Sequence, residues 1–311
     1  MCIINPAVKG NLWRPPLFTP FTFTNMGATG LNGPSTITYA NPPYSLNLVG
    51  GIQYVTIYRS GIYTFTVAGA GNTNSNSLNG IKTGYGMVMT RSYTLLAGTV
   101  LAILVGQMGI VGASDNRATG GSGGTFVATV LLSGSTAGAT LLFAAGGSGG
   151  VGFESDVVGN TTINGTTNGT GQDGGPSSPL DPTFVGAGGA GPNGGAVAVD
   201  PAYPGGNGGA GFSGNGAIAA GTNAKSFING GLGGTAQAGA DGGFGGGGGG
   251  GIDHGGIYPG GGGGGGYGGG GGGGTDASGA GGGGGGSYDI TGTVTGTATN
   301  SGMGYVTITY P

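Results

Sequence analysis

Two copies of the sequence GGSGG are the part of this chain that most resembles catalytic machinery. Gly120–Gly124 and Gly146–Gly150 both fit the Gly-x-Ser-x-Gly pattern, which presents a serine to a histidine base and an acid. The single histidine, His254, lies far beyond both serines in the sequence. In a chain with 88 glycines among 311 residues, such matches arise from composition alone. The sequence therefore predicts that the protein is not an enzyme, with catalytic residues: none.

Metal and cofactor sites have equally little support. One histidine and one cysteine, Cys2, do not supply the four ligands of a zinc site. Asp241, Asp253 and Asp276 are isolated from one another in the sequence, which is typical of turn residues. A calcium site built on them is the weaker alternative. We expect no metal and no cofactor.

Aromatic residues set between glycine runs are the better candidates for binding. Tyr258, Tyr267 and Tyr288 can form an exposed patch that stacks on a sugar or on a partner protein. The alternative is that these rings pack over the glycine segments and fill the space that missing side chains leave. Asn160, Asn164 and Asn168 begin three glycosylation sequons, which without a secretion signal predict an ordinary polar loop.

Charge and hydropathy exclude two classes of partner. Only 5% of the residues are charged, against about 25% in a typical protein, and no basic cluster suited to nucleic acid occurs. The opening MCIINPAVKG lacks the apolar stretch of a signal peptide. The longest apolar run, Val100–Val105, is too short to span a membrane. We expect a soluble protein made in a cytosol.

The residues from 51 to 145 read as strands. In Ile62–Val67, Tyr63, Phe65 and Val67 fall on one face and two threonines on the other, which is the period of a half-buried strand. Similar strands are predicted at 53–58, 87–96, 99–105, 125–132, 140–145 and 305–310. Turn residues at short spacing indicate an antiparallel, all-β sandwich or jelly roll with negligible α-helix. The last strand is expected to return to the same sheet, so that 51–145 and 287–311 form the β-sandwich.

Residues 1–50 are predicted to form an extended, proline-rich N-terminal arm. Prolines remove backbone donors and favour extended geometry. Trp13, Phe18, Phe21 and Phe23 lie among them as candidate partner-binding anchors. Two interpretations stay open: the arm lies on another subunit, or it packs on its own domain.

Residues 146–286 form the glycine zone, and ordering it is costly. Glycine loses more backbone freedom than any other residue when it is fixed. Collagen needs glycine at every third position, which these continuous runs do not show. We therefore predict a bundle of polyglycine-II helices, which have three residues per turn and pair backbone to backbone. The runs are Gly245–Gly251, Gly260–Gly266, Gly268–Gly274 and Gly281–Gly286.

Several motifs in this order resemble a known family. They are GIYTFTVAGAG at 61–71, LAILVGQMG at 101–109, GGSGGTFV at 120–127, LLFAAGGSGG at 141–150 and GMGYVTI at 302–308. Together they resemble the glycine-rich region of the anaplastic lymphoma kinase and leukocyte tyrosine kinase receptors. The resemblance covers about residues 60–311 and implies a tumour-necrosis-factor-like sandwich with an inserted polyglycine bundle. It is looser toward the polyglycine adhesins of phage tail fibres. The chain has no kinase and no paired cysteines, so a fold is implied and a receptor is not.

These observations lead to two expected functions. The first is a structural virion protein, capsid- or fibre-associated, made in the host cytoplasm and anchored to other virion subunits through its arm. The alternative is a host-attachment adhesin, in which the glycine bundle binds a host surface receptor or glycan. The resemblance also makes a homotrimer plausible as the assembled form.

Overall fold

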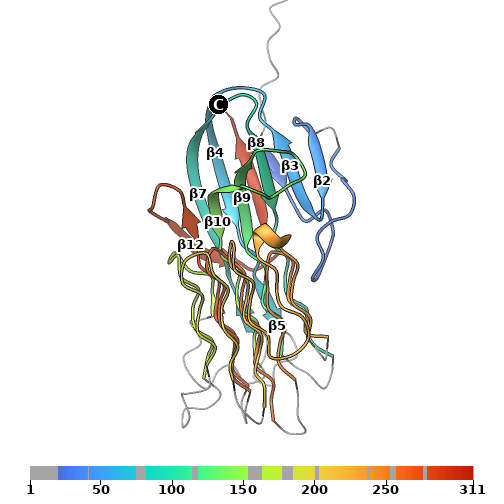
Figure 1. Cartoon of the computed structure of the whole chain (residues 1–311), viewed down its shortest axis with the longest axis vertical. Coiled ribbons are helices and arrows are strands. Elements are labelled where there is room, and N and C mark those ends of the chain that lie inside the picture. Colours follow the sequence, from blue (N-terminus) through green and yellow to red (C-terminus); the bar gives the residue numbers. More distant parts are fainter. Residues whose placement is uncertain are drawn as a thin grey trace, which may run out of the picture.

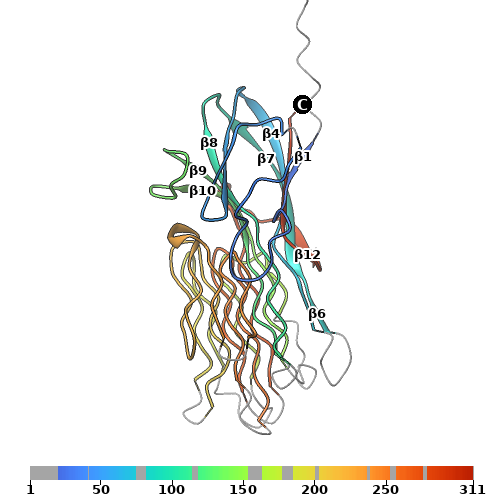
Figure 2. The same cartoon turned by 90° about the vertical axis from the view of Figure 1, so that its right-hand side faces the viewer.

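The structure is a computed structural model that describes residues 20–310, except 41, 75–81, 114–117, 153–162, 177–184, 200–202, 237–238, 253–256 and 276–278. A β-sandwich occupies one end of the molecule, and a set of extended glycine-rich segments occupies the other (Figures 1 and 2). Within the described residues there is no α-helix, and the strands pair in antiparallel sheets. The predicted all-β class is therefore confirmed.

Two sheets form the sandwich. The five-stranded sheet has the order β1 (Phe21–Phe23), β13 (Tyr305–Thr309), β4 (Gly61–Ala68), β7 (Gly86–Leu95), β12 (Gly296–Asn300). The six-stranded sheet has the order β11 (Tyr288–Asp289), β10 (Thr140–Ala145), β9 (Thr125–Val130), β8 (Val100–Leu104), β3 (Ile52–Thr56), β2 (Leu46–Val49). A separate ribbon pairs β5 (Asn72–Asn74) with β6 (Lys82–Gly84), and one 3-10 turn, η2, spans Phe227–Asn229.

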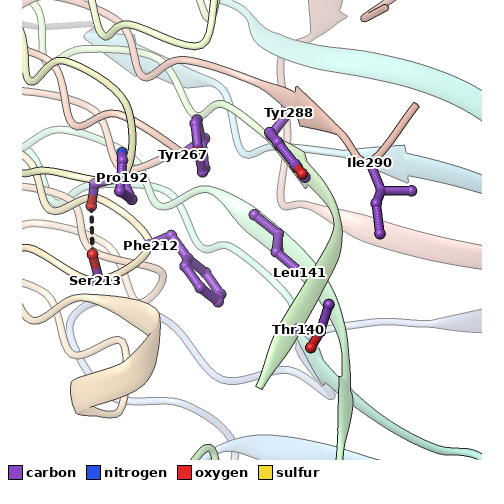
Figure 3. Close-up of a pocket in the computed structure, with 8 residues that line it drawn as sticks. All are labelled: Thr140, Leu141, Pro192, Phe212, Ser213, Tyr267, Tyr288 and Ile290. Carbon is purple, nitrogen blue, oxygen red and sulfur yellow. Dashed lines mark hydrogen bonds between the residues drawn. The ribbon is translucent and has the colours of Figure 1, made fainter. Parts of the chain in front are cut away.

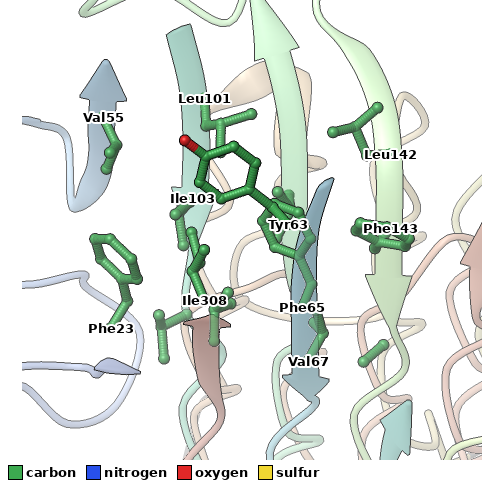
Figure 4. Packing of buried hydrophobic residues seen from close by; sticks show 14 of the residues in the cluster. Phe23, Val55, Tyr63, Phe65, Val67, Leu101, Ile103, Leu142, Phe143 and Ile308 are labelled. Carbon is green, nitrogen blue, oxygen red and sulfur yellow. The ribbon is translucent and has the colours of Figure 1, made fainter. Parts of the chain in front are cut away.

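The main core lies between the two sheets (Figure 4). From β4, Tyr63, Phe65 and Val67 point inward, as their alternation predicted, and all three are almost fully buried. They meet Ile103 of β8 and Phe143 of β10 from the opposite sheet. The last strand, β13, pairs with β4 from Tyr305↔Ala68 to Thr309↔Thr64. The predicted return of the C-terminus to the first sheet is thus confirmed.

The six-stranded sheet is buried on its second face as well. A second cluster on that face contains Leu104 of β8 and Phe126 of β9. Phe227 and Phe244, both from the glycine zone, pack against it and are 1% and 0% exposed. The outer face of this sheet is therefore not a solvent face, because the glycine zone covers it and supplies the aromatic side chains that fill the contact.

The N-terminal arm is shorter than predicted. β1 and β2 both lie within residues 20–50, and each is paired in the sandwich. Phe23 is 0% exposed in the main core, where Phe21 packs against its ring with centroids 4.9 Å apart. These two rings are anchored in their own domain because β13 offers a free edge on which β1 pairs. Trp13 and Phe18 lie outside the described residues.

The glycine zone leaves the six-stranded sheet and returns to it on neighbouring strands. β10 ends at Ala145, and the chain comes back at Tyr288 of β11, where Ala144 pairs with Tyr288. The excursion is thus an insertion between two adjacent strands. Glycines 120–124, ahead of β9, also hydrogen-bond into the glycine segments. We call these hydrogen-bonded segments together the glycine array.

Hydrogen bonds in the glycine array repeat every three residues. In the run Gly260–Gly266, residues three apart donate to the same neighbouring segment. The N–H to O pairs are 261→280 and 264→283, 262→119 and 265→122, and 263→207 and 266→210. The carbonyls of the same run accept from three further segments, through the N–H groups of 270 and 273, 147 and 150, and 248 and 251. One run is thus bonded to six neighbours.

This pattern differs from that of a sheet. A pleated strand alternates between two directions and bonds at most two neighbours. A three-residue period is the one that polyglycine-II helices require. The helical conformation of the single segments stays a prediction, and the backbone pairing that would stabilise it is present.

Candidate functional site

The two serines of the GGSGG sequences are buried. Ser122 and Ser148 are each 0% exposed. The Ser148 hydroxyl donates to the Ser122 hydroxyl over 3.3 Å, and Ser122 Oγ donates to the Gly71 carbonyl over 2.5 Å. Both side chains therefore bond inside the array and face no solvent. His254 lies outside the described residues.

The candidate metal ligands do not gather in the part of the chain that the structure describes. Asp241 Oδ1 accepts from the Ala236 backbone N–H over 2.7 Å, which is a local turn contact. Asp253 and Asp276 lie outside the described residues. Among those described, no group of three or more histidine, cysteine, aspartate or glutamate side chains could hold a metal ion.

Two of the three candidate tyrosines come together. The ring centroids of Tyr267 and Tyr288 are 4.5 Å apart and the rings are tilted by 30°. Tyr258 lies at the other end of the run Gly260–Gly266. The reason is that Gly261 donates to Ala280, whereas Tyr267 donates to Gly286, the opposite end of the same neighbouring segment. The predicted three-residue patch is thus a pair beside the sandwich plus one distant ring.

The tyrosine pair borders a pocket where the glycine array meets the sandwich (Figure 3). The pocket has a volume of about 360 Å³. Leu141, at the start of β10, is 6% exposed and forms its buried part. Phe212 lies across from the tyrosines, and the exposed hydroxyl of Ser213 follows it. The pocket thus combines aromatic faces with hydroxyl groups.

Backbone hydrogen bonds hold the aromatic residues in place. The Phe212 N–H donates to the Tyr267 carbonyl over 2.9 Å, and the Tyr267 N–H donates to Gly286 over 2.8 Å. The ring of Phe212 stacks on Phe227, with centroids 5.3 Å apart and planes 15° apart. Because Phe227 is buried against the six-stranded sheet, the pocket wall is connected to the core.

The electrostatics of the pocket are neutral. Burial raises the pKa of the Tyr288 phenol, and the neighbouring Tyr267 and Asp289 raise it further. Tyr288 therefore keeps its proton at physiological pH and can both donate and accept a hydrogen bond. The Asp289 carboxylate does not serve the pocket, because it is 1% exposed and paired with Arg91.

Sequence reasoning missed Phe212, Ser213 and Thr140 as pocket residues. Each lies in a short turn or at a strand end, and nothing in its local pattern indicates which distant segment lies beside it. A signal was present in the aromatic residues that interrupt the glycine-rich sequence, of which Phe212 is one.

In comparisons with known proteins, no protein-family model and no curated protein matches this chain. Among the described residues, no helix has the length and apolar character needed to cross a membrane.

Proposed function

We propose that this chain is a structural virion protein, capsid- or fibre-associated, that residues 1–19 attach to other virion subunits. The observation that carries the proposal is the polarity of the molecule. Phe21 pairs with Ile308, so β1 begins beside the end of β13. The C-terminus lies at the end of the sandwich remote from the glycine array (Figure 1). The segment that precedes β1 is therefore joined to the end opposite the array.

Stiffness of the array supports a structural role. Each ordered glycine costs about 1–2 kcal/mol of backbone entropy, and glycine loses the most freedom. Bonding of one run to six neighbours offsets this cost and couples the segments. We propose that the segments are polyglycine-II helices and act as a rigid projecting body. The resemblance to the glycine-rich region of the receptor kinases supports the same sandwich-plus-bundle arrangement.

Particle incorporation tests the anchoring role. A variant that lacks residues 1–19 retains β1, so its fold is expected to survive, as circular dichroism and thermal unfolding would verify. We expect this variant to be lost from purified particles. A sharper pair of variants is Trp13→Ser with Phe18→Ser against Lys9→Ser with Arg14→Ser. Loss of incorporation in the first pair alone supports apolar anchoring, and undiminished incorporation of the deletion contradicts the proposal.

Host attachment is the second candidate, and the same polarity favours it. The chain reverses between Gly251 and Gly260 and again between Gly274 and Ala280, at the end of the array away from the sandwich. A body anchored at its other end would present these turns outward. Binding of the purified protein to host cells, lost when both turns are replaced by glycine-serine linkers, would support attachment. Unchanged cell binding by that variant would oppose it.

A further inference from the structure

The pocket at the base of the glycine array combines rings and hydroxyls in a manner suited to one class of ligand. We propose that it is a binding site for a neutral saccharide, whose apolar face lies on the Tyr267 and Tyr288 rings. The pocket lies beside the sandwich and involves neither residues 1–19 nor the outer turns. The inference therefore goes beyond the proposed function, and its failure would leave the anchoring role untouched.

The shape and size of the pocket fit a small ligand. Its volume of about 360 Å³ is at the lower end of the range of about 300–1,000 Å³ typical of small-molecule sites. Tyr267, Tyr288 and Phe212 are each only partly buried, so ring surface remains open to a ligand. This space suits a mono- or disaccharide, and a long apolar chain would find too little enclosure in it.

The chemistry of the lining selects a sugar over an ion. None of the eight lining residues is charged, so an anion or cation would lose its hydration without a compensating partner. A sugar ring presents C–H groups on one face and hydroxyls around its edge. The tyrosine rings match the face, and the hydroxyls of Thr140, Ser213 and Tyr288 offer donors and acceptors to the edge.

The site is also preorganised. Tyr267 is held by backbone bonds to Gly286 and Phe212, and Phe212 is stacked on the buried ring of Phe227. Ile290, on the far side of Tyr288, is bonded through its N–H to the Leu142 carbonyl of β10 over 3.0 Å. Rings that are already fixed lose little freedom on binding, which favours affinity in a shallow site.

Binding of methyl glycosides and neutral disaccharides to the purified full chain tests the proposal. Saturation-transfer NMR would detect ligands, and titration calorimetry would measure affinity up to about 10 mM, where a ligand of millimolar affinity is bound. We expect at least one neutral saccharide to bind. Ser213→Trp fills the pocket from an exposed position and should weaken binding at least tenfold, whereas Ser301→Trp, exposed elsewhere, should leave it unchanged.

A second variant separates the ring from its hydroxyl. Tyr288→Phe keeps the aromatic face and removes one hydrogen-bonding group, so the affinity should fall severalfold while the thermal midpoint is retained. Binding that Ser213→Trp does not weaken would overturn the site. So would the absence of binding by every saccharide tested, or binding of the sulfonated dye anilinonaphthalene sulfonate alone.

Discussion

The Nε of Arg91 lies 2.7 Å from Oδ2 of Asp289, and this ion pair joins the two sheets of the sandwich. Arg91 belongs to β7 of the five-stranded sheet, and Asp289 belongs to β11 of the six-stranded sheet. Arg91 also donates to the Thr293 carbonyl over 2.8 Å. The pair thus ties the segment that returns from the glycine array to the opposite sheet.

Removing Arg91 should therefore destabilise the sandwich. Asp289 is 1% exposed, so Arg91→Leu leaves a buried carboxylate without its partner, and we expect a loss of about 2–4 kcal/mol in the free energy of unfolding. Chemical denaturation measures this loss. The double variant Arg91→Leu with Asp289→Leu removes the orphaned charge and should be more stable than the sum of the single changes. Strict additivity would show that the two residues are not coupled.

The packing of the array should reject any side chain at Gly263. A Cβ at this position would overlap the carbonyl oxygen of Gly270 and approach the Gly209 nitrogen to 2.6 Å. Gly263→Ala should cost about 3 kcal/mol or more, or abolish folding, because backbone cannot move aside as a side chain does. At Gly302 a Cβ would meet only Asn300 Oδ1 at 3.9 Å. Gly302→Ala is the matched control, and equal thermal midpoints for the two variants would refute close packing of the array.

Phe227 should be the main link between the array and the sandwich. Its ring lies 5.3 Å from that of Phe126 in β9 and 5.3 Å from that of Phe212. Phe227→Ala removes a fully buried ring and should cost about 3–5 kcal/mol. Ile218→Ala, at a side chain that is 49% exposed, should change stability by less than about 1 kcal/mol. Hydrogen exchange would locate the effect: faster exchange of the array amides alone supports the link, and exchange that is unchanged in the array contradicts it.

Alkaline pH should unfold the sandwich through Tyr44. Burial, with a smaller contribution from Tyr63, raises the pKa of Tyr44 from 10.0 to about 12. Between these values the unfolded chain ionises while the folded chain keeps its proton, so stability falls as pH rises. The full contribution is present below about pH 10, and the loss grows by about 1.4 kcal/mol per pH unit above it.

Two phenylalanine variants separate this effect from general alkaline damage. Tyr44→Phe should flatten the fall in stability between about pH 10 and pH 12, by about 2–3 kcal/mol at the upper end. Tyr58→Phe, at a side chain that is 58% exposed, is the control and should leave the slope as it is. Equal slopes for the two variants would rule out Tyr44 as the cause.

The strands were predictable because their signal is local. Alternation in Ile62–Val67 places Phe65 inward in any sheet, and the strand predicted at 140–145 has the same bounds as β10. Glycine content also indicated an ordered array whose stability depends on backbone pairing. In both cases the backbone period and the side-chain pattern are properties of the segment itself.

Only the tertiary structure decided which segments lie together. Successive glycines are chemically identical, so nothing in Gly260–Gly266 indicates that Gly263 bonds to Asn207 or that Tyr267 meets Tyr288. The burial of Phe23 likewise depends on the free edge of β13, which is more than half the chain away from it. Neighbours in the array are selected by turns and by the few aromatic residues that dock on the sheet, and such long-range contacts leave no local pattern.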